Sequence, residues 1–308
     1  MASGISSKVS IFVTATEMTM TKDRKDKIPV QRLLVPSYIL YAGKFLTAVS
    51  PFAASRFAAK LFLTPFRYKL PSREAEMDRD SRQETLRVPK INREIVVYHY
   101  GEGPKKILLV HGWSGRGTQL AVMAKALVEE GYSVISFDAP AHGKAPGKIS
   151  MMPFFIEAIH FLEKRYGPFE AAIGHSLGGM ASLRAAKEGL KIQKLIIIGT
   201  ANSVTHITRD FARNMKMSVK VADKMKEYLD RKFRTDMDSL SGAVSAQKVT
   251  VPTLVVHDED DVDVPVNSAY EIAESLEKGE LMITRKLGHR RILGDEKVIE
   301  RLLDFLKV

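Results

Sequence analysis

Three short aliphatic runs constrain the fold of this chain more than any other feature. They are ILLV at 107–110, LIII at 195–198 and LVV at 254–256. Successive side chains of a strand point to opposite faces, so a strand that is apolar throughout must be covered on both faces. Parallel sheets enclosed by helices meet this requirement. The runs therefore predict an α/β protein with a mostly parallel central sheet flanked by helices.

The chain from residue 94 onward alternates between strand and helix patterns. Strands are expected at 94–100, 106–112, 133–139, 171–176, 194–200, 253–259 and 280–286. Helices are expected at 118–132, 151–166, 177–189, 267–278 and 294–307. The stretch 201–250 interrupts this rhythm and predicts a small helical cap. Four methionines of the cap are expected to fill its core, with a flexible acyl pocket as the alternative: Met215, Met217, Met225 and Met237.

The N-terminal 93 residues have a different composition. Residues 1–27 predict no regular structure and are interpreted as disordered or vector-derived. Residues 28–70 are apolar and aromatic but divided by four prolines, and their longest helix is expected at 52–63. The charged stretch 71–93 is expected to be a linker or a surface turn. We favour a helical extension packed on the body over a basic amphipathic segment lying on an anionic membrane.

Composition excludes some chemistry and leaves other partners open. The chain has no cysteine, so disulfides and thiolate catalysis are excluded. Of 47 basic and 36 acidic residues, 17 and 8 fall in residues 1–93, which concentrates the net charge of +11 there. No nucleic-acid-binding motif accompanies this charge, so we expect no nucleic-acid partner. Without a secretory signal pattern, the expected location is cytoplasmic, with peripheral contact to the inner membrane face through 28–70 as an addition.

The clearest chemical signal is Gly174-His175-Ser176-Leu177-Gly178-Gly179, which ends an expected strand and begins an expected helix. A G-x-S-x-G sequence in this context is typical of a nucleophile elbow, in which a tight turn exposes the serine hydroxyl. The turn is so tight that side chains at 174 and 178 would collide with neighbours. Ser176 is therefore the candidate nucleophile.

A serine hydroxyl needs a general base, and the base needs an orienting carboxylate. His289 follows the last expected strand in a Leu-Gly-His turn and is the candidate base. The carboxylate should precede it, after the strand that ends near 257. Five residues there remain as alternatives on sequence grounds: Asp258, Glu259, Asp260, Asp261 and Asp263. A metal site in this acidic loop is not expected, since the spacing matches no standard cation loop.

Hydrolysis of an acyl compound also needs N–H donors for the developing oxyanion. The N–H of Leu177, directly after the nucleophile, is one candidate. The loop His111-Gly112-Trp113-Ser114-Gly115 follows an early strand and offers the N–H of Trp113 as the second. The side chains of Trp113 and His175 are expected to line the substrate site.

Five motifs together resemble the α/β-hydrolases, especially small bacterial esterases and lipases: HGWSG, FDAPAHG, GHSLGG, HDEDDVDVP and LGHRRIL. The resemblance covers residues 94–308. It implies the α/β-hydrolase fold and selects Asp261 as the triad acid, because in such relatives the acid stands four residues before the proline of a G-x-x-D-x-x-V-P run, here Pro265. Asp258 occupies the position of the family's glycine. Asp138 and His142 in the second motif are interpreted as structural.

The resemblance implies a carboxylic-ester hydrolase that forms an acyl-enzyme, with no cofactor and with a small ester carrying an apolar acyl group as substrate. Thioesterase, lactonase, C–C hydrolase, acyltransferase and perhydrolase chemistry remain alternatives, because fold does not fix function. A hydrolase-fold protein that binds a ligand without turnover is the alternative from another class.

Overall fold

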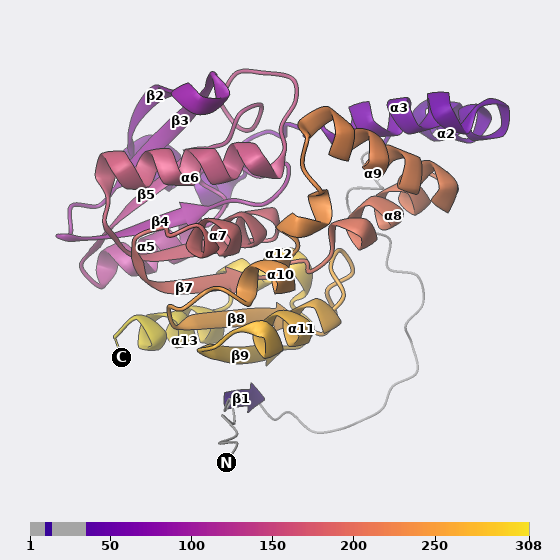
Figure 1. Ribbon diagram of the computed structural model, residues 1–308. Coiled ribbons are helices and arrows are strands. Elements are labelled where there is room, and N and C mark those ends of the chain that lie inside the picture. Colours follow the sequence, from indigo (N-terminus) through magenta and orange to yellow (C-terminus); the bar gives the residue numbers. More distant parts are fainter. Residues whose placement is uncertain (1–9, 14–34, 308) are drawn as a thin grey trace, which may run out of the picture.

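The computed structural model describes residues 35–307 and the backbone of residues 10–13. Its strands form one sheet in the order β1-β9-β8-β7-β6-β4-β5-β3-β2 (Figure 1). The strands are β1 (Ser10–Val13), β2 (Arg82–Val88), β3 (Arg93–Tyr100), β4 (Lys105–Val110), β5 (Tyr132–Asp138), β6 (Phe169–His175), β7 (Ile192–Ile198), β8 (Thr253–Asp258) and β9 (Gly279–Thr284). All neighbouring pairs are parallel except β2 with β3 and β3 with β5. The predicted mostly parallel sheet is confirmed.

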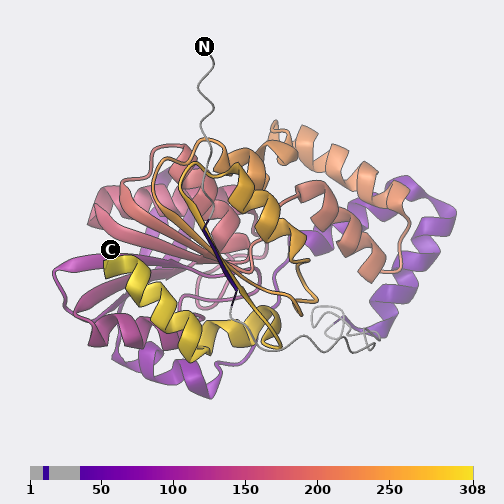
Figure 2. The same ribbon diagram turned by 90° about the horizontal axis from the view of Figure 1, so that it is seen from below.

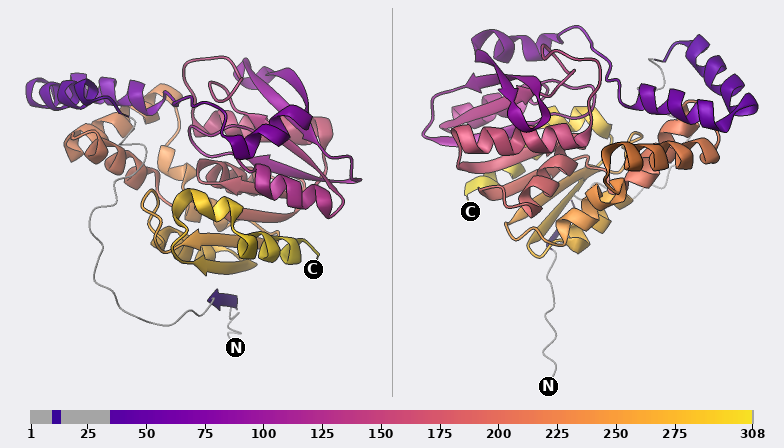
Figure 3. Two further views of the ribbon diagram at one scale, coloured as in Figure 1. Left: turned by 180° about the vertical axis from the view of Figure 1, so that it is seen from behind. Right: turned by 45° about the horizontal axis from the view of Figure 1, so that its top comes forward.

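Helices cover both faces of the sheet (Figure 2). The helices of the described residues are α2 (Ser37–Val49), α3 (Pro51–Phe62), α4 (Ala75–Asp80), α5 (Ala121–Glu129), α6 (Met152–Tyr166), α7 (Leu177–Lys187), α8 (Val204–Asn214), α9 (Val219–Phe233), α10 (Gly242–Ala246), α11 (Asn267–Ser275), α12 (Gly288–Arg291) and α13 (Glu296–Lys307). Figure 1 shows α6 and α7 in front of the sheet, and the view from behind in Figure 3 shows α13 on the opposite face.

The central strand β4 explains why the aliphatic runs are apolar throughout. Leu108 and Val110 belong to the core cluster shared with α6 and α7. Ile107 and Leu109 belong to a second cluster shared with α5 and α13. All four side chains are at most 1 % exposed. Alternate residues of one strand therefore fill two separate cores, as a sheet between two helical layers requires.

The sheet begins earlier in the chain than the sequence indicates. Residues 75–80 form α4, and residues 82–88 form β2, which pairs with β3 along its whole length, from Arg82 opposite His99 to Val88 opposite Arg93. The linker prediction for this stretch is wrong. An edge strand exposes one side to water, so its charged, alternating sequence RQETLRV resembles a surface turn.

The N-terminal segment also contains more regular structure than expected. Residues 10–13 form β1, which pairs with β9 in parallel, although the sequence predicts no regular structure there. The other residues of 1–34 lie outside the described part of the chain. The expected helix at 52–63 is confirmed as α3. The sequence does not predict the second helix, α2, because Pro36 and Pro51 indicate that this segment is divided into short elements. Both prolines stand at helix starts, where a missing N–H costs nothing.

The cap is confirmed as helical. It consists of α8, α9, the single turn Met237–Leu240 and α10, and α3 packs along α9 at the end of the molecule farthest from α13 (Figures 1 and 3). Small residues on α3 allow this close approach, and Phe62 stacks edge-on against Phe211 of α8 at 5.2 Å between ring centroids. All four cap methionines are buried, so they fill the core of the cap.

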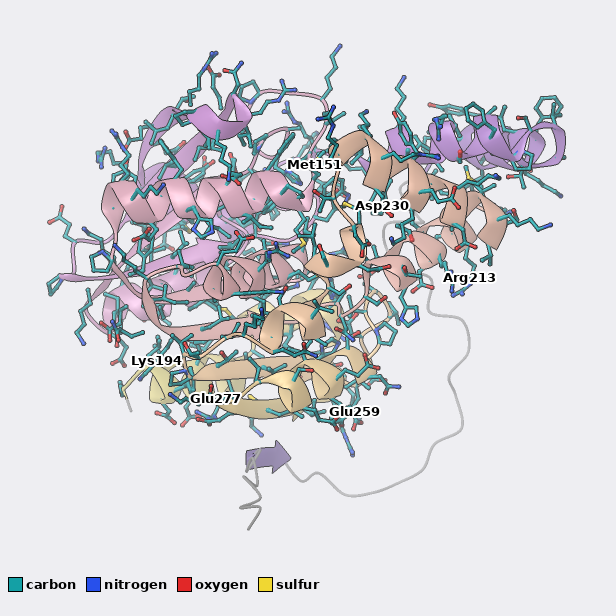
Figure 4. The ribbon with its side chains drawn as sticks, in the orientation of Figure 1. Met151, Lys194, Arg213, Asp230, Glu259 and Glu277 are labelled. Carbon is teal, nitrogen blue, oxygen red and sulfur yellow. The ribbon has the colours of Figure 1, made fainter. Side chains whose placement is uncertain are left out.

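One lysine holds the polar side of the cap together. Lys226 Nζ lies 2.8 Å from Asp230 and 3.2 Å from both Asp236 and Asp238. Figure 4 labels Asp230 on α9 and Arg213 on α8. Burial opposes the charge of Lys226, but the three carboxylates outweigh it and raise its pKa. The cation therefore ties α9 to the turn that leads to α10.

Candidate active site

A tight turn joins β6 to α7 at the G-x-S-x-G sequence. Ser176 has φ 54° and ψ −117°, a strained conformation for a residue with a side chain. Added Cβ atoms at Gly174 and Gly178 would lie 2.6 Å and 2.3 Å from carbonyl oxygens of Gly178 and Val110. Glycine is therefore required at both positions, and the tight turn leaves the Ser176 residue partly exposed at the helix N-terminus.

His289 and Asp261 form a close pair at the same edge of the sheet. His289 Nδ1 lies 2.7 Å from Asp261 Oδ2, and their side chains are only 9 % and 1 % exposed. Asp261 Oδ1 accepts the N–H groups of Asp263 and Val264, which fixes the carboxylate. Because a carboxylate only accepts, Nδ1 carries the proton and Nε2 is left as the basic nitrogen.

The end of β7 brings this pair beside Ser176. The N–H of Ser176 donates to the carbonyl of Ile198 at 2.8 Å. The next residue, Gly199, has φ 58°, and a Cβ there would lie 3.2 Å from His289 Nδ1. The His175 ring, adjacent in sequence to Ser176, lies 4.6 Å from the His289 ring between centroids. Ser176 and the His289–Asp261 pair therefore share one small region of the sheet edge.

Asp258 has a different task from Asp261. Its side chain accepts the N–H groups of Leu287 and Gly288 at 3.1 and 2.9 Å and the hydroxyl of Thr284 at 2.7 Å. Asp258 is 1 % exposed and is the last residue of β8. Leu287 and Gly288 lead into α12, which carries His289. The residue at the family's glycine position thus anchors the histidine loop to the acid loop.

The other carboxylates of the acidic loop lie at its margin. Asp260 accepts the N–H of Lys286 at 2.9 Å, and Glu259 pairs with Arg285 at 2.9 Å. Figure 4 labels Glu259 at the end of β8 that faces the cap. Among the five carboxylates of this loop, Asp261 is the one that is hydrogen-bonded to His289.

The loop after β4 lies against the elbow. A Cβ at Gly112 would lie 3.1 Å from Ser176 Cβ, so the two backbones approach closely. The N–H of Gly112 donates to Gln119 Oε1 at 2.7 Å, which fixes the start of the loop. The N–H groups of Trp113 and Leu177 have no hydrogen-bond acceptor within residues 35–307. Both are free to donate to a bound oxyanion.

A buried polar network supports this loop from below. His111 Nδ1 donates to the carbonyl of Gly112 at 2.7 Å, and its Nε2 accepts the N–H of Ala139 at 3.1 Å. Burial lowers the pKa of His111 to about 4, so the ring is neutral and joins two loops. Asp138 accepts the N–H groups of Gly117 and Lys144 and the hydroxyl of Tyr98. These contacts bear out a structural role for Asp138.

The N-terminal extension supplies contacts that the sequence did not indicate. The N–H of Phe66 donates to Ser114 Oγ at 3.0 Å, directly after Trp113. Arg67 donates to the carbonyls of Ala141 and Ala145 at 3.2 and 2.6 Å. The two loops meet where the Trp113 ring lies 5.2 Å from that of His142 between centroids. Residues 66–67, here termed the strap, therefore tie the extension to the loop that carries Trp113.

Two expected substrate contacts have different surroundings. The Trp113 residue is partly exposed at the elbow. His175 is only 2 % exposed, and its Nε2 donates to the carbonyl of His289 at 2.9 Å. Burial, with a smaller contribution from His289, lowers the pKa of His175 well below its usual value. A neutral, buried ring that holds the histidine loop has no surface to offer a substrate, so we assign His175 to positioning.

The remaining histidines are partnered or exposed elsewhere. His99 and His160 contact Glu84 and Glu188, and His206 is exposed on α8. His257 Nε2 donates to the carbonyl of Val264, behind Asp261. Within residues 35–307, one group has metal-ligand spacing: Asp261, Asp263 and His289, with ligand atoms within 4.8 Å of one another. This group shares His289 and Asp261 with the hydrogen-bonded pair.

Comparison with known proteins agrees with the topology. A family model described as the alpha/beta hydrolase fold matches residues 105–221, from β4 into the cap. An esterase from Pyrococcus furiosus superposes with a TM-score of 0.61 at 18 % identity, over 80 % of this chain and 97 % of that one. A bromoperoxidase from Bacillus anthracis superposes with a TM-score of 0.56 at 20 % identity, over 74 % of this chain and all of that one.

The protein has the α/β-hydrolase fold. Among curated proteins, the chain is similar to RutD of Variovorax paradoxus, named as a candidate carbamate hydrolase, with 23 % identity over 241 residues, 65 % of this chain and 91 % of that protein. The proteins to which this chain is similar therefore carry names for different reactions. At these identities the likeness establishes the fold, and the reaction must be argued from the site.

Proposed function

We propose that the protein hydrolyses carboxylic esters through an acyl-enzyme. Ser176 attacks the carbonyl carbon while Nε2 of His289 takes the hydroxyl proton. The N–H groups of Trp113 and Leu177 donate to the oxyanion that forms. His289 then gives the proton to the leaving alcohol, and a water molecule deprotonated by His289 releases the acid.

The observation that carries this proposal is the His289–Asp261 pair beside a strained serine. A 2.7 Å contact between buried side chains stabilises the imidazolium that forms when Ser176 loses its proton. The strain at φ 54° supports a functional role, because such a conformation persists only where the surroundings enforce it. Two unpartnered N–H groups next to the serine supply the donors that acyl transfer needs.

The test is hydrolysis of p-nitrophenyl esters from short to long acyl chains, with Ser176→Ala compared with wild type. Loss of the nucleophile should lower kcat by roughly three orders of magnitude or more. Ser182→Ala is the matched control, because Ser182 lies on the same helix α7 and its buried hydroxyl has no partner within the described residues. It should retain nearly full activity.

Other outcomes point to the alternatives. A panel that adds an acyl thioester, a lactone and an aryl carbamate separates the other hydrolytic reactions, and each should also depend on Ser176. Equal rates for wild type and Ser176→Ala contradict the proposal. If no substrate is turned over but one binds tightly, the ligand-binding function replaces it.

A further inference from the structure

Helix α2 presents a continuous apolar stripe to solvent. Tyr38, Tyr41, Phe45 and Val49 follow at spacings of three and four residues, which places them on one face of the helix. They are 72, 72, 66 and 66 % exposed, the highest values among the large apolar side chains of residues 35–307. An apolar face of this kind usually marks an interaction site.

The stripe lies on the side of α2 that faces away from the protein. Gly43 is the buried residue of this helix, and a Cβ there would lie 2.6 Å from Met217 Cε in the turn between α8 and α9. At 100° per residue, Gly43 lies roughly opposite Phe45. One face of α2 therefore holds the helix on the cap, and the other carries the aromatic side chains outward. Figure 1 shows α2 at the end of the molecule beyond the cap.

The segment that carries the stripe is positively charged. Residues 35–73 contain six lysines or arginines and no aspartate or glutamate. Lys44 of α2 and Lys216 of the α8–α9 turn line a shallow hollow, together with Ser37, Leu40 and Tyr41. Both lysines are exposed. The hollow therefore offers two ammonium groups beside an aromatic ring, a combination suited to a phosphate group at an apolar boundary.

We propose that the outward face of α2 binds the surface of an anionic lipid bilayer. The aromatic side chains insert at the boundary between headgroups and acyl chains, where amphipathic rings are favoured. Lys44 and Lys216 then contact headgroup phosphates. Self-association through the same face is disfavoured, because a two-fold dimer would bring the lysines of both copies together. Among the described helices, none combines the length and the hydropathy of a membrane span.

The test is co-sedimentation of the full chain with vesicles of phosphatidylcholine alone or mixed with phosphatidylglycerol. Wild type should pellet with the mixed vesicles. Tyr41→Ser combined with Phe45→Ser should lower partitioning at least about tenfold, because two exposed side chains lose their burial in lipid. Lys44→Gln combined with Lys216→Gln should remove most of the preference for phosphatidylglycerol, again roughly tenfold.

Tyr270→Ser on α11 is the matched control, since Tyr270 is 37 % exposed and distant from α2 in sequence and in fold. It should pellet like wild type. Wild type that stays in the supernatant overturns the proposal, as does equal pelleting of the stripe variant and Tyr270→Ser. A dimer that becomes a monomer in Tyr41→Ser/Phe45→Ser, measured by light scattering without lipid, also overturns it and identifies a second copy as the partner. Circular dichroism confirms folding, and no readout depends on the ester chemistry.

Discussion

The loops at the carboxyl edge of the sheet and the outward face of α2 differ in how their side chains are partnered. In the loops, Asp258 and Asp261 each accept several hydrogen bonds, and both are nearly buried. On α2, Tyr38 and Tyr41 are 72 % exposed. The first region is organised before a substrate arrives, whereas the second gains burial only when a partner covers it.

This contrast predicts different consequences of substitution. Removing one partner from a satisfied buried network leaves other groups unsatisfied, so it is expected to affect rate or stability strongly. Removing an exposed aromatic ring from α2 should affect association alone. Four substitutions test this contrast. Three of them lie in the organised region, and the fourth lies where the two regions meet.

The largest effect is expected for Asp261→Asn. An amide cannot stabilise the His289 imidazolium and favours the wrong tautomer, so kcat should fall by about four orders of magnitude with little loss of stability. Ester hydrolysis and thermal unfolding measure the two quantities. Asp263→Asn is the control, because it changes a carboxylate of the same loop that is not the hydrogen-bond partner of His289. If both variants lose activity equally, Asp261 has no special role in orienting His289.

Asp258→Ala should have the next largest effect. It removes the acceptor for the N–H groups of Leu287 and Gly288, which precede His289. Buried N–H groups without an acceptor cost about 1–3 kcal/mol each, so unfolding should become easier by roughly 3 kcal/mol and kcat should fall by about two orders of magnitude. Glu259→Ala, which breaks an exposed pair with Arg285, should change either quantity only slightly. Wild-type activity in Asp258→Ala would contradict the anchoring role.

Features that depend on local geometry or on burial could be predicted from the sequence. The tight turn at Ser176 could be predicted because it depends on local backbone geometry that few residues permit, such as glycine at 174 and 178. The strands β4, β7 and β8 could be predicted because burial on both faces leaves a long apolar run.

Other features depend on contacts between segments that are distant in sequence. The anchoring by Asp258 joins residues 29 and 30 positions apart, and the strap bond of Phe66 spans 48 positions. The edge strand β2 carries charge on its outer side, and the prolines beside α2 lie at helix starts rather than inside helices. Composition alone cannot distinguish these cases, because the same residues also occur in loops.

Stability should fall in acid because His111 is buried and neutral. Its pKa drops from 6.5 to about 4 on folding, chiefly through burial. The unfolded state therefore binds a proton that the native state does not, and stability is full above about pH 6.5 and is lost down to about pH 4. The loss amounts to about 3 kcal/mol for this group.

Urea unfolding between pH 7 and pH 4 measures this dependence. His111→Gln keeps a donor for Gly112 and an acceptor for Ala139 but cannot titrate, so its midpoint should vary less with pH than that of wild type. His142 and His175, whose pKa values burial also lowers, maintain part of the dependence in the variant. Identical pH profiles for wild type and His111→Gln would contradict this account.

The smallest effect is expected where the two regions meet, at Arg67 of the strap. Its guanidinium donates to the carbonyls of Ala141 and Ala145, in the loop that packs on Trp113. Because Arg67 is exposed, Arg67→Ala should lower the free energy of unfolding by only about 1 kcal/mol. A looser loop should lower kcat severalfold, since the N–H of Trp113 is less well positioned. Lys69→Ala, a nearby exposed cation, is the control. If Arg67→Ala lowers stability but leaves kcat unchanged, the strap joins the extension to the body without organising the site, and the two regions act independently.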